Sequence, residues 1–207
     1  PGQLGNVRGG QLDGLLADVK HYAEQVRERV WGEIGHLYPK GPNGETIIAW
    51  LWAWTARCPN PACGATMPLV SSMWLSKKKS QTRALTATPT GDGVSFEVAD
   101  KPNPESGTVG RGGALCLNCN TKSPLADIRS FASTDGLGLQ LLCTVGDGPA
   151  GRAYFAPSDL PSPEPAAHGH LDVALPEKAL GFRVQAYGMT SHRDIFTNRQ
   201  LVMLEAF

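Results

Sequence analysis

Four cysteines arranged in two pairs constrain this chain more than any other feature. Four residues separate Cys58 from Cys63, and two residues separate Cys116 from Cys119. Structural zinc sites are built from two such short turns, each supplying two thiolates at about 2.3 Å from a tetrahedral Zn²⁺. Gly64, directly after Cys63, lets the backbone turn beneath a metal. We therefore expect Cys58, Cys63, Cys116 and Cys119 to hold one structural zinc ion.

Two other interpretations of these cysteines stay open. Disulfide bonds would leave one of the five cysteines unpaired, and the chain opens without a hydrophobic leader. It is also longer than most disulfide-dense secreted domains, so a reducing, cytoplasmic location is expected. A thioredoxin-like motif needs a helix directly after Cys119, and Pro124 disfavours one there.

The fifth cysteine, Cys143, lies in an apolar run and is expected to be a core residue.

The composition favours short strands joined by turns over a helical bundle. Among 207 residues there are 24 glycines and 16 prolines, and only 18% of the residues are charged. The 19 basic residues offset 19 acidic ones, which argues against a free-standing, non-specific nucleic-acid binder. The longest apolar stretch, residues 47–56, is too short to span a bilayer, so no membrane partner is expected.

The hydrophobic pattern predicts an α+β fold, with an N-terminal amphipathic helix and mainly antiparallel β structure around an elaborated zinc ribbon. We expect four parts, which are a helical segment (1–45), the zinc ribbon with an inserted hairpin (46–130), a β-hairpin with a proline-rich loop (131–190) and the start of a truncated helix (191–207). The truncation is expected to reflect a longer protein.

Periodicity places the individual elements. Apolar residues recur at three- and four-residue steps over residues 11–37, which is typical of a helix. Strands are expected at 46–57, 68–75, 83–88, 94–98, 139–145 and 151–155. Thr197 and Gln200 have capping-box spacing and predict the start of the last helix.

Two features suggest binding surfaces. Trp50, Trp52 and Trp54 alternate along one strand, so their indoles share a face that either stacks nucleic-acid bases or, more commonly, packs against a neighbouring element. A segment free of acidic residues carries four cations that are candidate phosphate contacts, namely Lys77, Lys78, Lys79 and Arg83. Lysines on an edge strand also discourage aggregation between sheets.

Recognisable catalytic patterns are missing. The five histidines, which include the His168 and His170 pair, lack zincin spacing, and the chain has neither a Gly-x-Ser-x-Gly elbow nor a Walker loop. The glycine-rich stretch 107–113 precedes a cysteine turn instead of a helix, so it lacks the amide cradle that binds phosphate. We expect no enzymatic activity from this stretch alone.

Several ordered segments resemble the prokaryotic adenine-specific DNA methylases that contain a zinc ribbon. The segments are 35–39, 48–64, 67–70, 74–79, 107–109, 116–119 and 196–201. The resemblance covers roughly residues 15–207. In that family, a class I methyltransferase fold binds S-adenosylmethionine at one motif and presents adenine N6 at a later one, and the ribbon region lies between them. Neither catalytic motif is in this chain, so no catalytic residue and no S-adenosylmethionine site carries over.

The resemblance implies that the chain is the inserted central region of such a methylase. Its four cysteines would hold structural Zn²⁺, and its role would be to recognise or hold DNA beside the catalytic domain. The expected partners are then DNA and the remainder of its own chain. The alternative is a protein-interaction module, in which the tryptophan-rich sheet docks a partner or the rest of the same chain.

Overall fold

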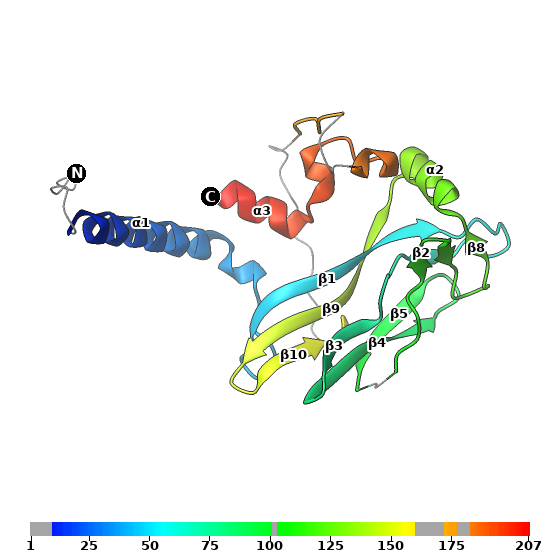
Figure 1. Ribbon diagram of the computed structural model, residues 1–207, viewed down its shortest axis with the longest axis horizontal. Coiled ribbons are helices and arrows are strands. Elements are labelled where there is room, and N and C mark those ends of the chain that lie inside the picture. The colour runs from blue at the N-terminus through cyan, green and yellow to red at the C-terminus, as the bar shows by residue number, and fades with distance from the viewer. Residues whose placement is uncertain (1–9, 101–102, 160–171, 178–182) are drawn as a thin grey trace. The chain divides into compact units, whose positions relative to one another are not determined.

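The computed structural model describes residues 10–100, 103–159, 172–177 and 183–207, with side chains from residue 14 onward (Figure 1). His168, His170 and most of the expected proline-rich loop lie outside the described residues. The chain divides into two compact units. The described part of the first unit comprises residues 10–39 and 196–207, and the second unit contains the remaining described residues.

The described part of the first unit contains three helical elements. α1 (Gly10–Ile34) continues into the short 3-10 helix η1 (Gly35–Leu37), as the apolar periodicity predicts. α3 (Asn198–Ala206) begins at a capping box, in which the Thr197 hydroxyl accepts from the Gln200 amide and the Gln200 side chain accepts from the Thr197 amide. This cap supplies partners for amides that a helix start otherwise leaves unpaired.

A buried arginine joins α3 to the end of α1. Among the described residues of this unit, the buried apolar ones are Val30, Ile34 and Leu201, and the Arg199 side chain is buried at 5% exposure. Arg199 donates a hydrogen bond to the Leu37 carbonyl, and its Cζ lies 5.7 Å from the Tyr38 ring centroid. The guanidinium thus satisfies a carbonyl at the end of η1 while it stacks on an aromatic face.

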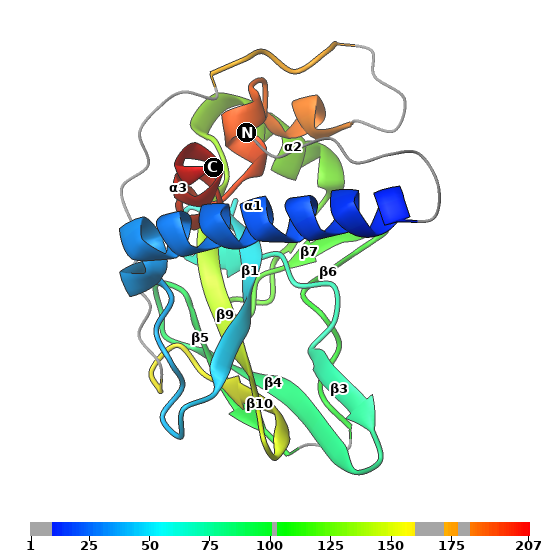
Figure 2. The same ribbon diagram turned by 90° about the vertical axis from the view of Figure 1, so that its left-hand side faces the viewer.

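In the second unit, the described residues form antiparallel strands in three sheets (Figures 1 and 2). The largest has the order β10-β9-β1-β2, the second β3-β4-β5 and the smallest β6-β7-β8. The strands are β1 (Thr46–Arg57), β2 (Thr66–Pro68), β3 (Trp74–Lys78), β4 (Gln81–Pro89), β5 (Val94–Ala99), β6 (Val109–Gly110), β7 (Gly113–Leu115), β8 (Lys122–Ser123), β9 (Gly138–Gly148) and β10 (Gly151–Phe155). The helical elements are α2 (Leu125–Asp135), η2 (Val184–Tyr187) and η3 (His192–Ile195).

Two apolar clusters stabilise this unit. The larger cluster joins the β1 and β9 sheet to the β3-β4-β5 sheet, and its buried members are Ala53, Val70, Met73, Leu85, Val94, Phe96, Leu142, Cys143 and Val145. Cys143 is fully buried there, which confirms the prediction that it is a core residue. The second cluster surrounds the cysteine turns. The α+β fold with antiparallel sheets and an N-terminal helix is therefore confirmed.

Two local predictions were incomplete. α2 starts at Leu125, directly after Pro124, where no helix was expected from the sequence. Pro124 is the N-cap residue, so its missing amide removes no bond within the helix, and its carbonyl accepts from the Ile128 amide. The strand expected at residues 68–75 is divided into β2 and β3. Between these strands, Val70 donates its amide to the buried Thr108 hydroxyl, and its carbonyl accepts from the Val109 amide at the start of β6. The backbone here is therefore hydrogen-bonded to residues 108–109.

We predict that Arg199→Leu loosens α3. The change keeps much of the bulk of the side chain but leaves the Leu37 carbonyl without this donor, which costs about 1–3 kcal/mol. Hydrogen exchange of the α3 amides should accelerate accordingly. Arg29→Leu is the matched control, because Arg29 is exposed on α1 and forms a surface ion pair with Glu33. Equal exchange in the two variants would contradict this role of Arg199.

Candidate metal centre

The first cysteine turn connects β1 to β2. Cys58 donates its amide to the Ala65 carbonyl at 2.8 Å, which closes the turn. Within the turn, Cys63 and Gly64 both donate their amides to the Asn60 carbonyl, at 2.9 and 3.0 Å. Gly64 has a φ of 56°, a left-handed conformation that glycine adopts without strain. The turn therefore directs both cysteine side chains to one side.

The second cysteine turn connects β7 to β8 and repeats this hydrogen-bond pattern. Cys116 donates its amide to the Thr121 carbonyl at 2.9 Å, and Asn120 donates its amide to the Cys116 carbonyl at 2.8 Å. Asn120 has a φ of 60° and takes the place that Gly64 has in the first turn. Asparagine tolerates this conformation better than most residues. The two turns are thus structurally equivalent, although the first is longer.

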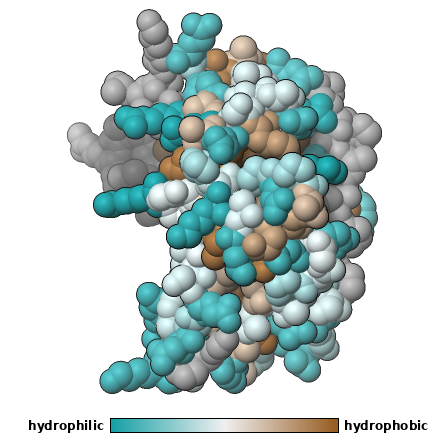
Figure 3. All heavy atoms as spheres, turned by 90° about the vertical axis from the view of Figure 1, so that its right-hand side faces the viewer, coloured by the Kyte–Doolittle hydropathy of each residue, from teal (hydrophilic) through white to brown (hydrophobic). Residues whose placement is uncertain are grey.

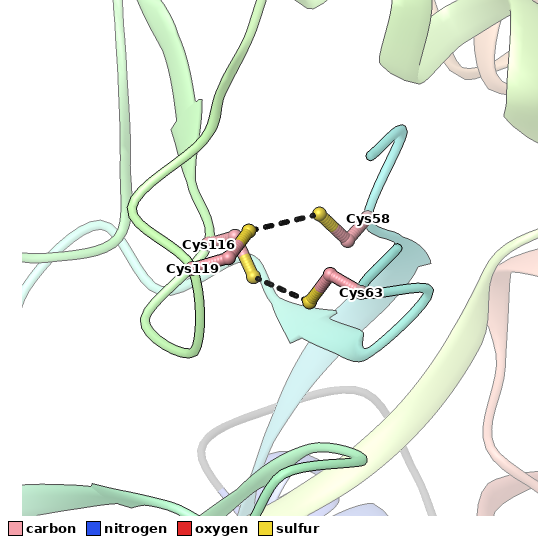
Figure 4. A group of neighbouring side chains, drawn as sticks. All are labelled: Cys58, Cys63, Cys116 and Cys119. Atoms are coloured by element: carbon pink, nitrogen blue, oxygen red, sulfur yellow. Dashed lines mark hydrogen bonds between the residues drawn. The ribbon is translucent and has the colours of Figure 1, made fainter. Parts of the chain in front are cut away.

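The four sulfur atoms converge between the two turns (Figure 4). All four Sγ atoms lie within 4.8 Å of one another. Across the turns, the Sγ atoms of Cys58 and Cys119 are 3.5 Å apart, and those of Cys63 and Cys116 are 3.9 Å apart. Sulfur atoms at about 2.3 Å from a tetrahedral Zn²⁺ are about 3.8 Å apart. The cluster therefore fits a zinc ion in size and in ligand type.

The structure gives no support to the other interpretations of these cysteines. All five cysteines are free thiols, so the disulfide arrangement is not observed. Cys119 lies in the β7–β8 turn and does not open a helix, as a thioredoxin-like motif would require. Because the cluster offers four protein ligands, a bound zinc ion would have no open position for chemistry, which is the arrangement of a structural site.

The electrostatic surroundings of the sulfur atoms differ. Burial raises the pKa of Cys58 to about 12, because an apolar environment disfavours the thiolate. The Thr121 hydroxyl, which lies 3.2 Å from the Cys119 Sγ, and then the Thr121 amide lower the pKa of Cys119 to about 6. Thr121 therefore favours a thiolate at one corner of the cluster, whereas metal binding must displace a proton from Cys58.

Apolar side chains from several elements enclose the two turns. Cys58 and Cys116 are buried, and Cys63 and Cys119 are half-buried. The surrounding cluster contains Ala56, Ala65, Met67, Ala114 and Ile128, contributed by β1, β2, β7, α2 and the first turn. Ile128 comes from α2, the helix that was not expected from the sequence. A dry setting of this kind strengthens the attraction between thiolates and a cation.

The loop between β4 and β5 contacts both cysteine turns. Asn118, inside the second turn, accepts from the Gly91 amide at 2.9 Å and donates to the Gly93 carbonyl at 2.8 Å. Thr66, just beyond the first turn, donates its amide to the Asp92 carbonyl at 2.8 Å. The inserted hairpin is therefore fastened by its tip to both halves of the cysteine cluster.

The predicted phosphate contacts lie at the other end of this hairpin sheet. Lys77, Lys78 and Lys79 are exposed where β3, an edge strand, turns into β4. Lys77 pairs with Thr82 and Lys78 with Gln81, so these two lysines project from opposite faces of the sheet. Arg83 is half-buried and forms an ion pair with Asp100, so it already has an acidic partner.

The tryptophan row lies in a different sheet from the lysines. Trp50, Trp52 and Trp54 are half-buried along β1. Trp54 also lines an apolar pocket of about 430 Å³, together with residues of α2 and η2 that include Ile128 and Tyr187. Apolar areas separated by polar side chains are visible at the surface in Figure 3. The three β1 indoles and the lysines therefore do not form a single aromatic and basic face.

Comparison of the chain with protein-family models, curated proteins and solved structures found no match. The case for a metal site therefore depends on the geometry of the four cysteines. In the described part of the chain, no helix has the length and apolar character that crossing a bilayer requires.

We predict that the purified chain binds one zinc ion and that metal removal unfolds the region around the cysteine turns. Structural zinc contributes an apparent binding free energy of about 10–16 kcal/mol in small zinc domains. Native mass spectrometry should find one zinc ion in the wild type and none in Cys116→Ser. Cys143→Ser is the control, because Cys143 lies outside the cluster. A Cys116→Ser protein that folds normally without metal would count against the site.

We also predict that Thr121→Val releases metal at a higher pH than the wild type. A lowered thiol pKa stabilises the folded protein above the ordinary thiol range, and this stabilisation is lost as the pH falls through about 6. Without the Thr121 hydroxyl the pKa of Cys119 rises, so protons compete with the metal sooner. A colorimetric zinc indicator would follow release during acid titration. Thr88→Val, on the exposed end of β4, should match the wild type, and coincident release curves for all three proteins would refute the effect of Thr121.

Proposed function

We propose that this chain is the zinc-ribbon region of an adenine-specific DNA methyltransferase and that it recognises or holds DNA without being catalytic by itself. The ordered sequence motifs support the family, and the four-cysteine cluster supports the ribbon. S-adenosylmethionine would bind elsewhere in the full-length enzyme, because neither catalytic motif occurs in this sequence. DNA and the rest of the enzyme would then be the partners of this region.

The observation that carries the proposal is the connection between the cysteine turns and the lysines. The β4–β5 loop is hydrogen-bonded to both turns through Asn118 and Thr66. β4 leads from the lysine-bearing turn to this loop, and its nine residues span about 30 Å. A zinc ion at one end would therefore fix the direction in which Lys77, Lys78 and Lys79 project at the other.

Local contacts support a phosphate-binding role for this turn. The Lys77 Nζ lies 5.5 Å from the centroid of the Trp74 ring, which restrains one ammonium group near an aromatic surface. Arg83, which pairs with Asp100, is better suited to holding β4 in position than to contacting DNA. Lysine ammonium groups bind backbone phosphates as point charges, and such contacts carry no sequence information. This surface would therefore bind DNA without sequence specificity.

Phosphate binding of this kind suits the chemistry of an adenine methylase. The target N6 inside a duplex is reached only when the base leaves the stack, which costs a few kcal/mol. Contacts to phosphates beside the catalytic domain would hold the distorted strand while the base is displaced. The zinc ion would contribute rigidity, since four protein thiolates leave it no position for substrate.

The alternative function, docking of a partner through the tryptophan-rich sheet, is favoured by one observation. The three indoles of β1 are half-buried, and Trp54 borders an apolar pocket. Tryptophan is enriched where proteins bind one another. Because these indoles are separate from the lysines, the two surfaces could bind different partners. The β1 sheet would bind protein, and the β3–β4 turn would bind DNA.

The DNA-binding role predicts the salt dependence of binding. Replacing Lys77, Lys78 and Lys79 with glutamine should weaken binding to duplex DNA, because each lysine neutralises a phosphate. The slope of log affinity against log salt concentration should become shallower by about 0.9 for every phosphate that is no longer neutralised. Fluorescence anisotropy with the zinc-loaded chain over a range of salt concentrations measures this slope.

Lys20→Gln serves as the control, because Lys20 is an exposed lysine in the other unit. An unchanged slope in the triple variant would contradict the proposal that this turn contacts DNA. The absence of wild-type binding at low salt would contradict it as well. The docking function would then be the better account.

A further inference from the structure

Most of the apolar face of α1 is exposed. Leu15, Leu16, Val19, Tyr22 and Val26 are 62%, 52%, 56%, 59% and 42% exposed. By contrast, Val30 and Ile34, near the end that packs with α3, are buried, although Trp31 between them is exposed. Contiguous apolar surface of this kind marks interaction sites on soluble proteins. Among the described residues, nothing therefore covers several turns of the apolar surface of this helix.

The spacing of this face is that of a coiled-coil seam. Leu16, Val19, Ala23, Val26 and Val30 follow one another at alternating steps of three and four residues. This step pattern gives a repeat of about 3.5 residues, which places the seam against one facing helix along its length. A helix that packs on a sheet has no need of so regular a repeat. The surface thus matches a helical partner.

Charges along one edge of the seam indicate the chemistry of that partner. Lys20 and Arg27, one heptad apart, border the seam, and neither forms an ion pair with the described residues. The nearby acidic residues Glu24 and Glu28 fall farther from the seam on the helix surface. This edge is therefore cationic, and an acidic border on the facing helix would complement it.

The α1 helix of a second copy of this chain does not offer acidic residues at the positions that would face Lys20 and Arg27. In a parallel pair, Lys20 and Arg27 would face Leu15 and Tyr22 of the second copy, because one flank of a seam meets the opposite flank of its partner. Neither of these residues is acidic. Arg29, on the other flank, is already paired with Glu33 at 3.4 Å.

We propose that α1 docks an amphipathic helix of a partner protein, whose apolar seam is bordered by aspartate or glutamate. The partner helix would lie along residues 15–26 and place its acidic side chains opposite Lys20 and Arg27. The proposal is independent of the DNA-binding role, since it uses a different unit of the chain from the cysteine turns and the lysine turn.

The test uses two synthetic helical peptides, each about three heptads long, with identical leucine seams. One carries glutamate at every seam border, and the other carries lysine there. Fluorescence anisotropy with the full chain should show binding of the glutamate-bordered peptide and about tenfold weaker binding of the lysine-bordered one. The double variant Lys20→Glu with Arg27→Glu should reverse this preference.

Two further variants separate the seam from the rest of the helix. Val19→Asp should abolish binding of both peptides, because it places a charge in the seam. Glu24→Gln with Glu28→Gln, away from the seam, should leave both affinities unchanged. Circular dichroism would verify that each variant retains its helix content, which is expected because all of these side chains are exposed.

Equal affinity for the two peptides, or no binding of either, would overturn the proposal. Sedimentation analysis tests directly whether a second copy of this chain, instead of a partner protein, covers α1. A dimer of the chain that Val19→Asp dissociates would show that a second copy covers α1, and this result would also overturn the choice of an acidic partner.

Discussion

The convergence of four cysteine thiols is the interaction on which the second unit depends. The cysteines that approach each other across the turns are 61 and 53 positions apart in the chain. The β3-β4-β5 sheet lies between them in sequence, and its β4–β5 loop is hydrogen-bonded to both turns. Thiolates crowded in this way repel one another unless a cation neutralises them. A bound zinc ion would therefore hold together the turns, the loop and, through β4, the exposed lysines.

The two ends of the second unit differ in character. The apolar cluster around Phe96 and Val145 gives the sheets their packing, and the cysteine cluster fixes the end where the strands β6, β7 and β8 are very short. The lysine turn lies at the opposite end of β4 and is open to solvent. A zinc ion bound at the cysteine end would keep the lysine turn rigid while leaving it exposed.

The parts of the structure that follow local patterns were predictable from sequence. The cysteine pairs indicated which four thiols converge, alternation placed β1 and β9, and three- and four-residue steps placed α1. α2 was missed because Pro124 was interpreted as a helix breaker, although it precedes an apolar pattern at Leu125, Ile128 and Ala132 that fits a helix start.

Contacts between distant residues could not be predicted in this way. The bonds of Asn118 to the β4–β5 loop and the ion pair of Arg83 with Asp100 depend on the tertiary arrangement. Periodicity likewise indicated that α1 has an apolar face but not that most of it would be exposed.

The central claim is that the four cysteine thiolates bind one zinc ion, and X-ray absorption at the zinc edge of the purified chain tests it most directly. We predict four sulfur neighbours at about 2.3 Å, whereas a spectrum with nitrogen or oxygen neighbours, or a protein without zinc, would contradict it.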